Sequence, residues 1–167
     1  MQLHAHQKNL QDDIYKAWIT HRNVLAELAT GGGKTVVFCD IVRKHKGAAC
    51  IIAHRQELVT QISMALARFN VQHRIIGPQA VVNLAVAQHV EELGQSPYNP
   101  RSQIAVAGVD TLIKRKDLAV WSKTVGLWVT DEAHHIQSNN KWGKAVAMFP
   151  NAKGLGVSAT PCRADGQ

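Results

Sequence analysis

Cysteine is scarce in this chain, which has three in 167 residues. Cys39, Cys50 and Cys162 have no C-x-x-C spacing and are odd in number, so we expect no disulfide framework and a reducing compartment. No apolar run approaches the roughly 20 residues that a membrane span requires, and the polar residues 1–8 lack the apolar core of a signal peptide. The sequence therefore predicts a cytoplasmic protein without a membrane partner.

Internal repeats and low-complexity tracts are also missing, and residues 94–100 are the clearest loop. Since 46% of the residues are hydrophobic, the chain can bury a substantial core as one domain over residues 1–167. Acidic residues are few: 12 Asp and Glu stand against 19 Lys and Arg, and the net charge is +7. This balance favours a polyanionic partner.

Strand-like and helix-like segments alternate along the chain. Apolar strand candidates lie at residues 24–28, 48–54, 104–108, 125–130 and 154–158, with a weaker one at 74–76. Helical periodicity of apolar residues marks residues 7–19, 36–46, 56–69 and 81–93. This alternation predicts a single α/β domain with a mostly parallel sheet and helices on both faces.

A glycine-rich turn at residues 30–35 separates the first strand candidate from the following helix. Glycines let successive backbone N–H groups point inward around a polyphosphate. Lys34 can place its ammonium against the β- and γ-phosphates, and the Thr35 hydroxyl can coordinate Mg²⁺. Leu28 stands where the strict P-loop pattern has its first glycine, and a flexible loop is the alternative interpretation. The predicted ATP-binding residues here are Thr30, Gly31, Gly32, Gly33, Lys34 and Thr35.

Two carboxylates, Asp131 and Glu132, follow the buried strand candidate at residues 125–130. Ligands of open α/β sheets bind at such strand ends. Asp131 is placed to hold Mg²⁺, and Glu132 to orient and deprotonate the water that attacks the γ-phosphate. An acidic helix cap is the alternative. Together with Lys34 and Thr35, the pair favours a nucleoside triphosphatase.

The order and spacing of these motifs resemble the first motor domain of superfamily 2 helicases and translocases, the DEAD/DEAH-box group with a RecA-like P-loop fold. Residues 29–35 match motif I, residues 131–134 match motif II, and residues 158–160, Ser-Ala-Thr, match motif III. The resemblance covers the whole chain and looks closest to bacterial and phage DNA helicases, including restriction-enzyme motor subunits. It implies that ATP hydrolysis is coupled to movement on nucleic acid through His134, Ser158, Ala159 and Thr160.

The resemblance also assigns contacts to nucleic acid. Residues 53–61 look like motif Ia and residues 108–112 like motif Ib, and both motifs contact the sugar-phosphate backbone in the family. Each segment follows a strand end and begins a helix, so it can face a phosphodiester, although an ordinary helix cap has the same pattern. We expect a DNA partner more than RNA, without strong sequence preference. The candidate contacts are Arg55, Gln56, Asp110 and Thr111, with the basic run 114–116 and stacking by Trp121 or Trp142 as weaker possibilities.

Residues 3–7 resemble the family segment in which a glutamine reads the adenine edge, since an amide donates and accepts hydrogen bonds at once. Gln7 is the candidate. His4 and His6 stand where the family has an arginine and an aromatic residue. The two histidines could instead be metal ligands, but no third ligand has a sensible spacing, which favours a solvated terminus.

In the family, ATP lies between two RecA-like domains, and arginine fingers accelerate related reactions by about 10³ to 10⁵. We expect the second domain to be missing here, so that this chain alone binds ATP weakly, hydrolyses it little and unwinds nothing. Two other classes stay open. One is a nucleotide switch without motor activity, which a partner protein reads; the other is a small-molecule kinase, which the motif III segment disfavours.

Overall fold

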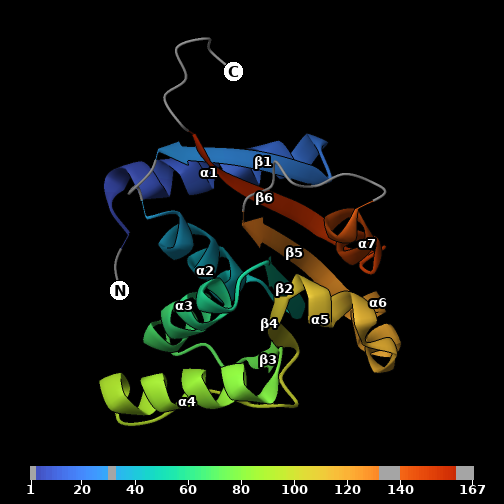
Figure 1. Cartoon of the computed structure of the whole chain (residues 1–167). Coiled ribbons are helices and arrows are strands. Elements are labelled where there is room, and N and C mark those ends of the chain that lie inside the picture. Colours follow the sequence, from blue (N-terminus) through green and yellow to red (C-terminus); the bar gives the residue numbers. More distant parts are fainter. Residues whose placement is uncertain (1–2, 30–32, 132–139, 161–167) are drawn as a thin grey trace.

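The computed structural model describes residues 3–29, 33–131 and 140–160. In this part of the chain six strands form one sheet in the order β1-β6-β5-β2-β4-β3, and every neighbouring pair is parallel (Figure 1). The strands are β1 (Asn23–Ala29), β2 (Ala48–Ala53), β3 (Arg74–Ile76), β4 (Ile104–Gly108), β5 (Val125–Asp131) and β6 (Lys153–Thr160). The helices are α1 (Ala5–Thr20), α2 (Lys34–Lys44), α3 (Gln56–Arg68), α4 (Gln79–Leu93), α5 (Val109–Lys114), η1 (Lys116–Leu118), α6 (Ala119–Thr124) and α7 (Lys141–Ala147).

The predicted α/β class is confirmed, and the expected strands and the four expected helices are present with small shifts at their ends. The sequence did not predict α6 or α7, because six or seven residues are too few to show helical periodicity. At α7 a local signal exists: the Asn140 side chain accepts a hydrogen bond of 3.0 Å from Gly143 N–H and so caps the helix. None of the described helices is long and apolar enough to cross a bilayer.

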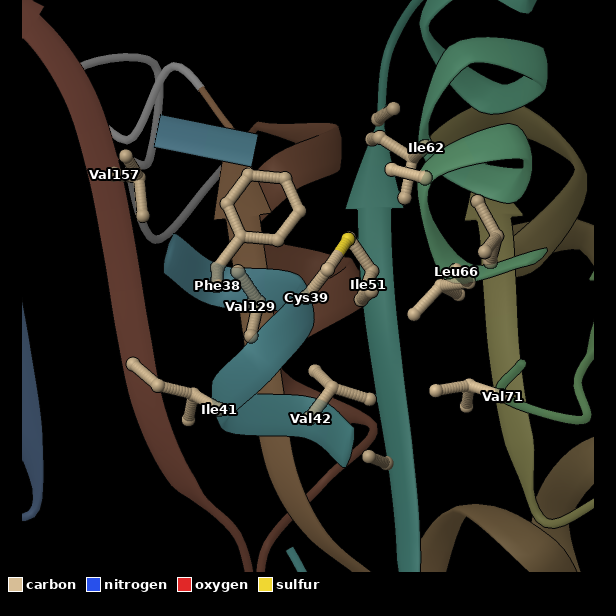
Figure 2. Close-up of a cluster of buried hydrophobic side chains, with 14 of the residues drawn as sticks. Phe38, Cys39, Ile41, Val42, Ile51, Ile62, Leu66, Val71, Val129 and Val157 are labelled. Atoms are coloured by element: carbon tan, nitrogen blue, oxygen red, sulfur yellow. The ribbon is translucent and has the colours of Figure 1, made fainter. Parts of the chain in front are cut away.

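β2 shows why the sheet is covered on both faces. All six of its residues are buried, and successive side chains of a strand point to opposite faces. Ala49, Ile51 and Ala53 belong to the core under α1 to α4, whereas Cys50 and Ile52 belong to the core under α5 and α7. Figure 2 shows the first core, in which side chains of α2 gather against the strands. Its labelled members include Phe38, Cys39, Ile41, Val42, Ile51, Ile62, Leu66, Val71, Val129 and Val157.

Gly154 of β6 leaves room for the indole of Trp128 on the neighbouring strand β5. The two residues are paired in the parallel register, and a Cβ added at Gly154 would lie 2.0 Å from Trp128 Cζ2 and 2.3 Å from Cε2. The Gly154 carbonyl also accepts a 2.9 Å hydrogen bond from Trp18 Nε1, which fastens α1 to β6. A glycine is therefore required here by packing.

A buried polar chain joins α3, α4 and the segment before β3. His73 Nδ1 lies 2.8 Å from the Val71 carbonyl and must carry the proton, so His73 Nε2 accepts from the Ser63 hydroxyl at 2.7 Å. Ser63 Oγ then accepts from His89 Nε2 at 2.9 Å, and His89 Nδ1 accepts from Ser96 at 2.7 Å. Both histidines are fully buried. With both rings neutral, each N–H and O–H group that joins two members of this chain has an acceptor.

We expect acid to destabilise the fold through His73. Burial, together with nearby His89, lowers the pKa of His73 from 6.5 to about 4, and burial also lowers the pKa of His89. The unfolded chain binds more protons below pH 6.5, so this stability is complete above pH 6.5 and is lost as the pH falls towards 4. For His73 alone the loss at pH 5 is about 2 kcal/mol. Urea unfolding followed by circular dichroism at pH 7.5 and pH 5 measures it.

The control separates this effect from the titration of carboxylates. His73→Gln removes one titrating ring and should reduce the difference in unfolding free energy between the two pH values. His21→Gln changes an exposed histidine and should leave that difference unchanged. Equal pH dependence in both variants would show that His73 is not responsible.

Candidate nucleotide and nucleic-acid site

Parallel pairing places the carboxyl ends of all six strands at one edge of the sheet. β1 ends before the glycine-rich segment of the sequence and α2, β5 ends at Asp131, and β2 and β4 end before α3 and α5 (Figure 1). The segments that the sequence marks for phosphate, metal and nucleic acid therefore share this edge, which is where ligands of such sheets bind.

Lys34 and Asp131 meet at the carboxyl edge. Lys34 opens α2 and Asp131 closes β5, and Lys34 Nζ lies 2.7 Å from Asp131 Oδ1. Asp131 is 2% exposed. A carboxylate removed from water in this way needs a counter-charge, which the lysine ammonium supplies. The structure thus brings together the two residues predicted to bind phosphate and metal.

Gly33 and Gln7 form a second contact at the same edge. Gly33 has a φ of 74°, in the left-handed region that favours glycine, and a Cβ there would lie 2.3 Å from Gln7 Nε2. The buried Gln7 amide donates from Nε2 to the Gly33 carbonyl at 3.4 Å and accepts the His4 backbone N–H on Oε1 at 2.7 Å. The candidate base-reading side chain therefore lies against the start of α2, the helix that the sequence predicts to bind phosphate.

The other residues predicted for nucleotide binding and coupling that the structure describes lie in α2 and in β6. Thr35 follows Lys34 in the first turn of α2 and is half-buried. The motif III segment lies in β6, between β1 and β5, with Ser158 opposite Glu27 and Val157 opposite Asp131. Ala159 and Thr160 complete that strand. The predicted residues Thr30, Gly31, Gly32, Glu132 and His134 lie outside the described residues.

The four candidate nucleic-acid contacts lie on neighbouring strand ends. Arg55 and Gln56 begin α3 after β2, and Asp110 and Thr111 lie in the first turn of α5 after β4; the two strands pair directly. Lys141 of α7 adds a residue that the sequence did not predict, because no motif marks it. Its Nζ lies 3.2 Å from Asp110 Oδ1, so it offsets an acidic charge on this surface.

The weaker candidates are mostly occupied by the protein itself. Trp142 is 4% exposed and belongs to the second core, so the interpretation as a base-stacking residue is wrong for it. The half-buried Trp121 donates from Nε1 to the Gln103 carbonyl at 3.0 Å and packs edge-on against a core phenylalanine. In the basic run, Arg115 pairs with Asp117, and its hydrogen bond lowers the pKa of that carboxyl to about 2. The exposed Lys114 and Lys116 flank that pair.

The residues at the edge fit MgATP better than a protein-only metal site. No group of three or more His, Cys, Asp and Glu side chains gathers within residues 3–29, 33–131 and 140–160. Mg²⁺ is usually held by one or two carboxylates together with substrate phosphates and water. Asp131 supplies such a carboxylate, and the Lys34 ammonium 2.7 Å from it shows that this carboxylate is placed to accept a positive charge. Thr35, next to Lys34 in the first turn of α2, is the residue that would add a hydroxyl.

The chain is similar in sequence to restriction-enzyme and helicase proteins. A family model described as "Type III restriction enzyme, res subunit" matches residues 1–163. The Putative ATP-dependent helicase IRC3 of Saccharomyces cerevisiae is 29% identical over 159 residues, which covers 86% of this chain and 21% of that protein. The chain thus spans about a fifth of that curated relative's length.

Solved structures of two known proteins share the fold. The UvsW helicase from bacteriophage T4 has a TM-score of 0.65 at 16% identity, over 96% of this chain and 53% of that one. A nuclease-deletion mutant of the Type ISP restriction-modification enzyme LlaGI, in complex with a DNA substrate mimic, has a TM-score of 0.67 at 12% identity, over 96% of this chain and 18% of that one.

Proposed function

Since this chain belongs to the family of the type III restriction enzyme res subunit and is the first RecA-like domain of a superfamily 2 helicase, we propose that it binds ATP with Mg²⁺ and forms the hydrolytic half of a nucleic-acid motor. The observation that carries the proposal is the 2.7 Å contact between Lys34 and Asp131 at the carboxyl edge. It supports one shared site for a triphosphate and its metal ion.

The proposed chemistry divides among four side chains. Lys34 moves its ammonium from Asp131 to the β- and γ-phosphates, and Asp131 and Thr35 hold the metal ion. When bound, Mg²⁺ neutralises negative charge on the phosphate oxygens. Glu132 orients the attacking water and takes its proton on a carboxylate oxygen. Ser158, on the strand next to β5, and His134 then couple the state of this site to nucleic acid.

The proposed nucleic-acid surface starts at α3 and α5. Arg55, Gln56 and Thr111 bind phosphates of the backbone, and Lys141 keeps Asp110 from repelling them. The net charge of +7 supports a polyanionic partner. We propose DNA, in line with the DNA substrate mimic bound to the restriction enzyme of the same fold.

A second RecA-like domain would complete the motor. The chain covers 21% of its yeast relative and 53% of the UvsW chain, which leaves room in such proteins for that domain. We propose that arginines from it neutralise charge during phosphoryl transfer, a contribution of about 10³ to 10⁵ in related enzymes.

Salt dependence of nucleic-acid binding tests the proposal. We expect the chain to bind MgATP and, separately, a labelled oligonucleotide whose affinity falls linearly on a log–log plot against salt, because bound phosphates release counterions. Arg55→Ala should reduce that slope by about one. Fluorescence anisotropy with single-stranded and duplex DNA and RNA of equal length gives the slopes and the preferred strand.

Arg101→Ala is the matched control, since Arg101 is exposed and precedes β4 at the opposite edge of the sheet. It should leave the slope unchanged if the nucleic acid lies at the carboxyl edge. Retained ATP binding without measurable nucleic-acid binding at about 50 mM salt would contradict the motor and favour a nucleotide switch.

A further inference from the structure

Two glutamines of α1 contact α2 in matching steps. Gln7 Nε2 donates to the Gly33 carbonyl at 3.4 Å, and Gln11 Nε2 donates to the Val37 carbonyl at 3.1 Å. In both helices the second contact lies four residues, or one turn, after the first. The two helices are thus held in register from the start of α2 onward. The sequence did not predict a role for Gln11, although its spacing from Gln7 places both residues on one face of the helix.

Asp40 anchors the second of these contacts. Gln11 Nε2 also donates to Asp40 Oδ2 at 2.9 Å, while Arg43 Nε donates to Oδ1 at 2.9 Å and Lys44 Nζ lies 3.0 Å from Oδ2. Asp40 is 2% exposed and Gln11 is 4% exposed. Burial acts to raise the pKa of Asp40, but hydrogen bonds from Gln11, Arg43 and Lys44 outweigh it and hold the pKa below the usual value. The acceptor is therefore a charged, fixed carboxylate at neutral pH.

We propose that Gln11 and Asp40 are positioning residues for nucleotide selection: they fix the distance between the Gln7 amide and the phosphate-binding start of α2. This inference rests on the proposed function, in which Gln7 reads the base and Lys34 holds the phosphates. An amide distinguishes adenine from guanine only if its donor and acceptor stay in place while the triphosphate is bound. The Gln11–Asp40 contact supplies that restraint, one turn after Gln7 on α1 and about two turns after Gly33 on α2, without touching the nucleotide.

A merely structural role makes a different prediction. If Gln11 only stabilised the fold, its loss would weaken every ligand of the site alike. As a positioning residue it affects recognition of the base and leaves recognition of the phosphates intact, because Lys34 is the first residue of α2 and Gly33 its N-cap. The ratio of ATP to GTP affinity, compared with the affinity for inorganic tripolyphosphate, separates the two roles.

Gln11→Leu removes the hydrogen bonds and keeps most of the side-chain volume. We expect the preference of the 167-residue chain for ATP over GTP to fall by about 3- to 10-fold, the range for losing one hydrogen bond between the Gln7 amide and the base. Calorimetric titration with Mg²⁺ measures this preference. The affinity for tripolyphosphate should stay within about twofold. Asn9→Leu, an exposed position of the same helix, is the control and should keep the preference of the unaltered chain.

Changes at Asp40 give an independent pair. Asp40→Asn keeps an oxygen that can accept from Gln11 and should keep the preference, whereas Asp40→Leu should lose it as Gln11→Leu does. If Gln11→Leu does not fold, the comparison of Asp40→Asn with Asp40→Leu tests the same inference. An unchanged preference in the leucine variants, or equal loss for ATP, GTP and tripolyphosphate, overturns the inference. An unaltered chain that binds no ATP overturns the proposed function, and the inference with it.

Discussion

We expect the replacement of Lys34 by alanine to weaken the binding of MgATP by about a hundredfold. The ammonium is the side-chain cation at the start of α2, and truncating one member of a desolvated charge pair costs several kcal/mol. The same change leaves the buried Asp131 carboxylate without its 2.7 Å counter-charge. Titration with a fluorescent ATP analogue measures the affinity, and a thermal melt shows whether the variant is folded.

Two other variants make the comparison specific. Lys123→Ala removes an exposed lysine of α6, at the opposite edge of the sheet, and should bind the analogue like the unaltered chain. Glu132→Gln removes the proposed base and should also keep the nucleotide bound, since Glu132 acts on the water and not on the phosphates. Binding that falls equally in Lys34→Ala and Glu132→Gln would contradict the separate roles given to them.

We expect Gly154→Ala to lower the free energy of unfolding by about 3 kcal/mol, at the upper end of the range for overpacked cores. The added Cβ would lie 2.0 Å from Trp128 Cζ2, far inside the contact distance of two carbon atoms. Trp128 is 5% exposed and packed in the second core, so its ring cannot turn away without moving its neighbours. Urea unfolding followed by circular dichroism measures the loss.

Gly77→Ala is the matched control. A Cβ at Gly77 would have its nearest neighbours at 4.0 Å, in ordinary contact with Ile75 and Val81, and its φ lies outside the left-handed region. Its stability should stay within about 0.5 kcal/mol of the unaltered chain, because the lower entropy of the unfolded state offsets small costs. Similar losses at both positions would mean that contact with Trp128 is not the cause.

The order of elements follows from local sequence signals, whereas their contacts depend on topology. Apolar runs such as residues 48–53 predict buried parallel strands, because both faces of such strands are covered. The packing of the Trp128 indole over Gly154 could not be predicted, since it depends on which strands are neighbours and in which register. The short helix α7 was missed because propensity over seven residues is weak, even with Asn140 as its cap.

For the site, the residue types and their strand ends are predictable, and the distances are not. Lys34 and Asp131 could be placed at one edge because both follow strands, but their direct contact is a property of the folded chain. Gln11 and Asp40 carry no motif at all. Their contact results from the packing of α1 on α2, which a single sequence does not specify.

The position of β6 limits how this sheet can move. β6 pairs with β1 over its residues 154–160 and with β5 over its residues 153–157. Shear of β6 by one residue would break both ladders and turn every side chain to the opposite face. The strands under the Lys34–Asp131 pair therefore serve as a stationary base.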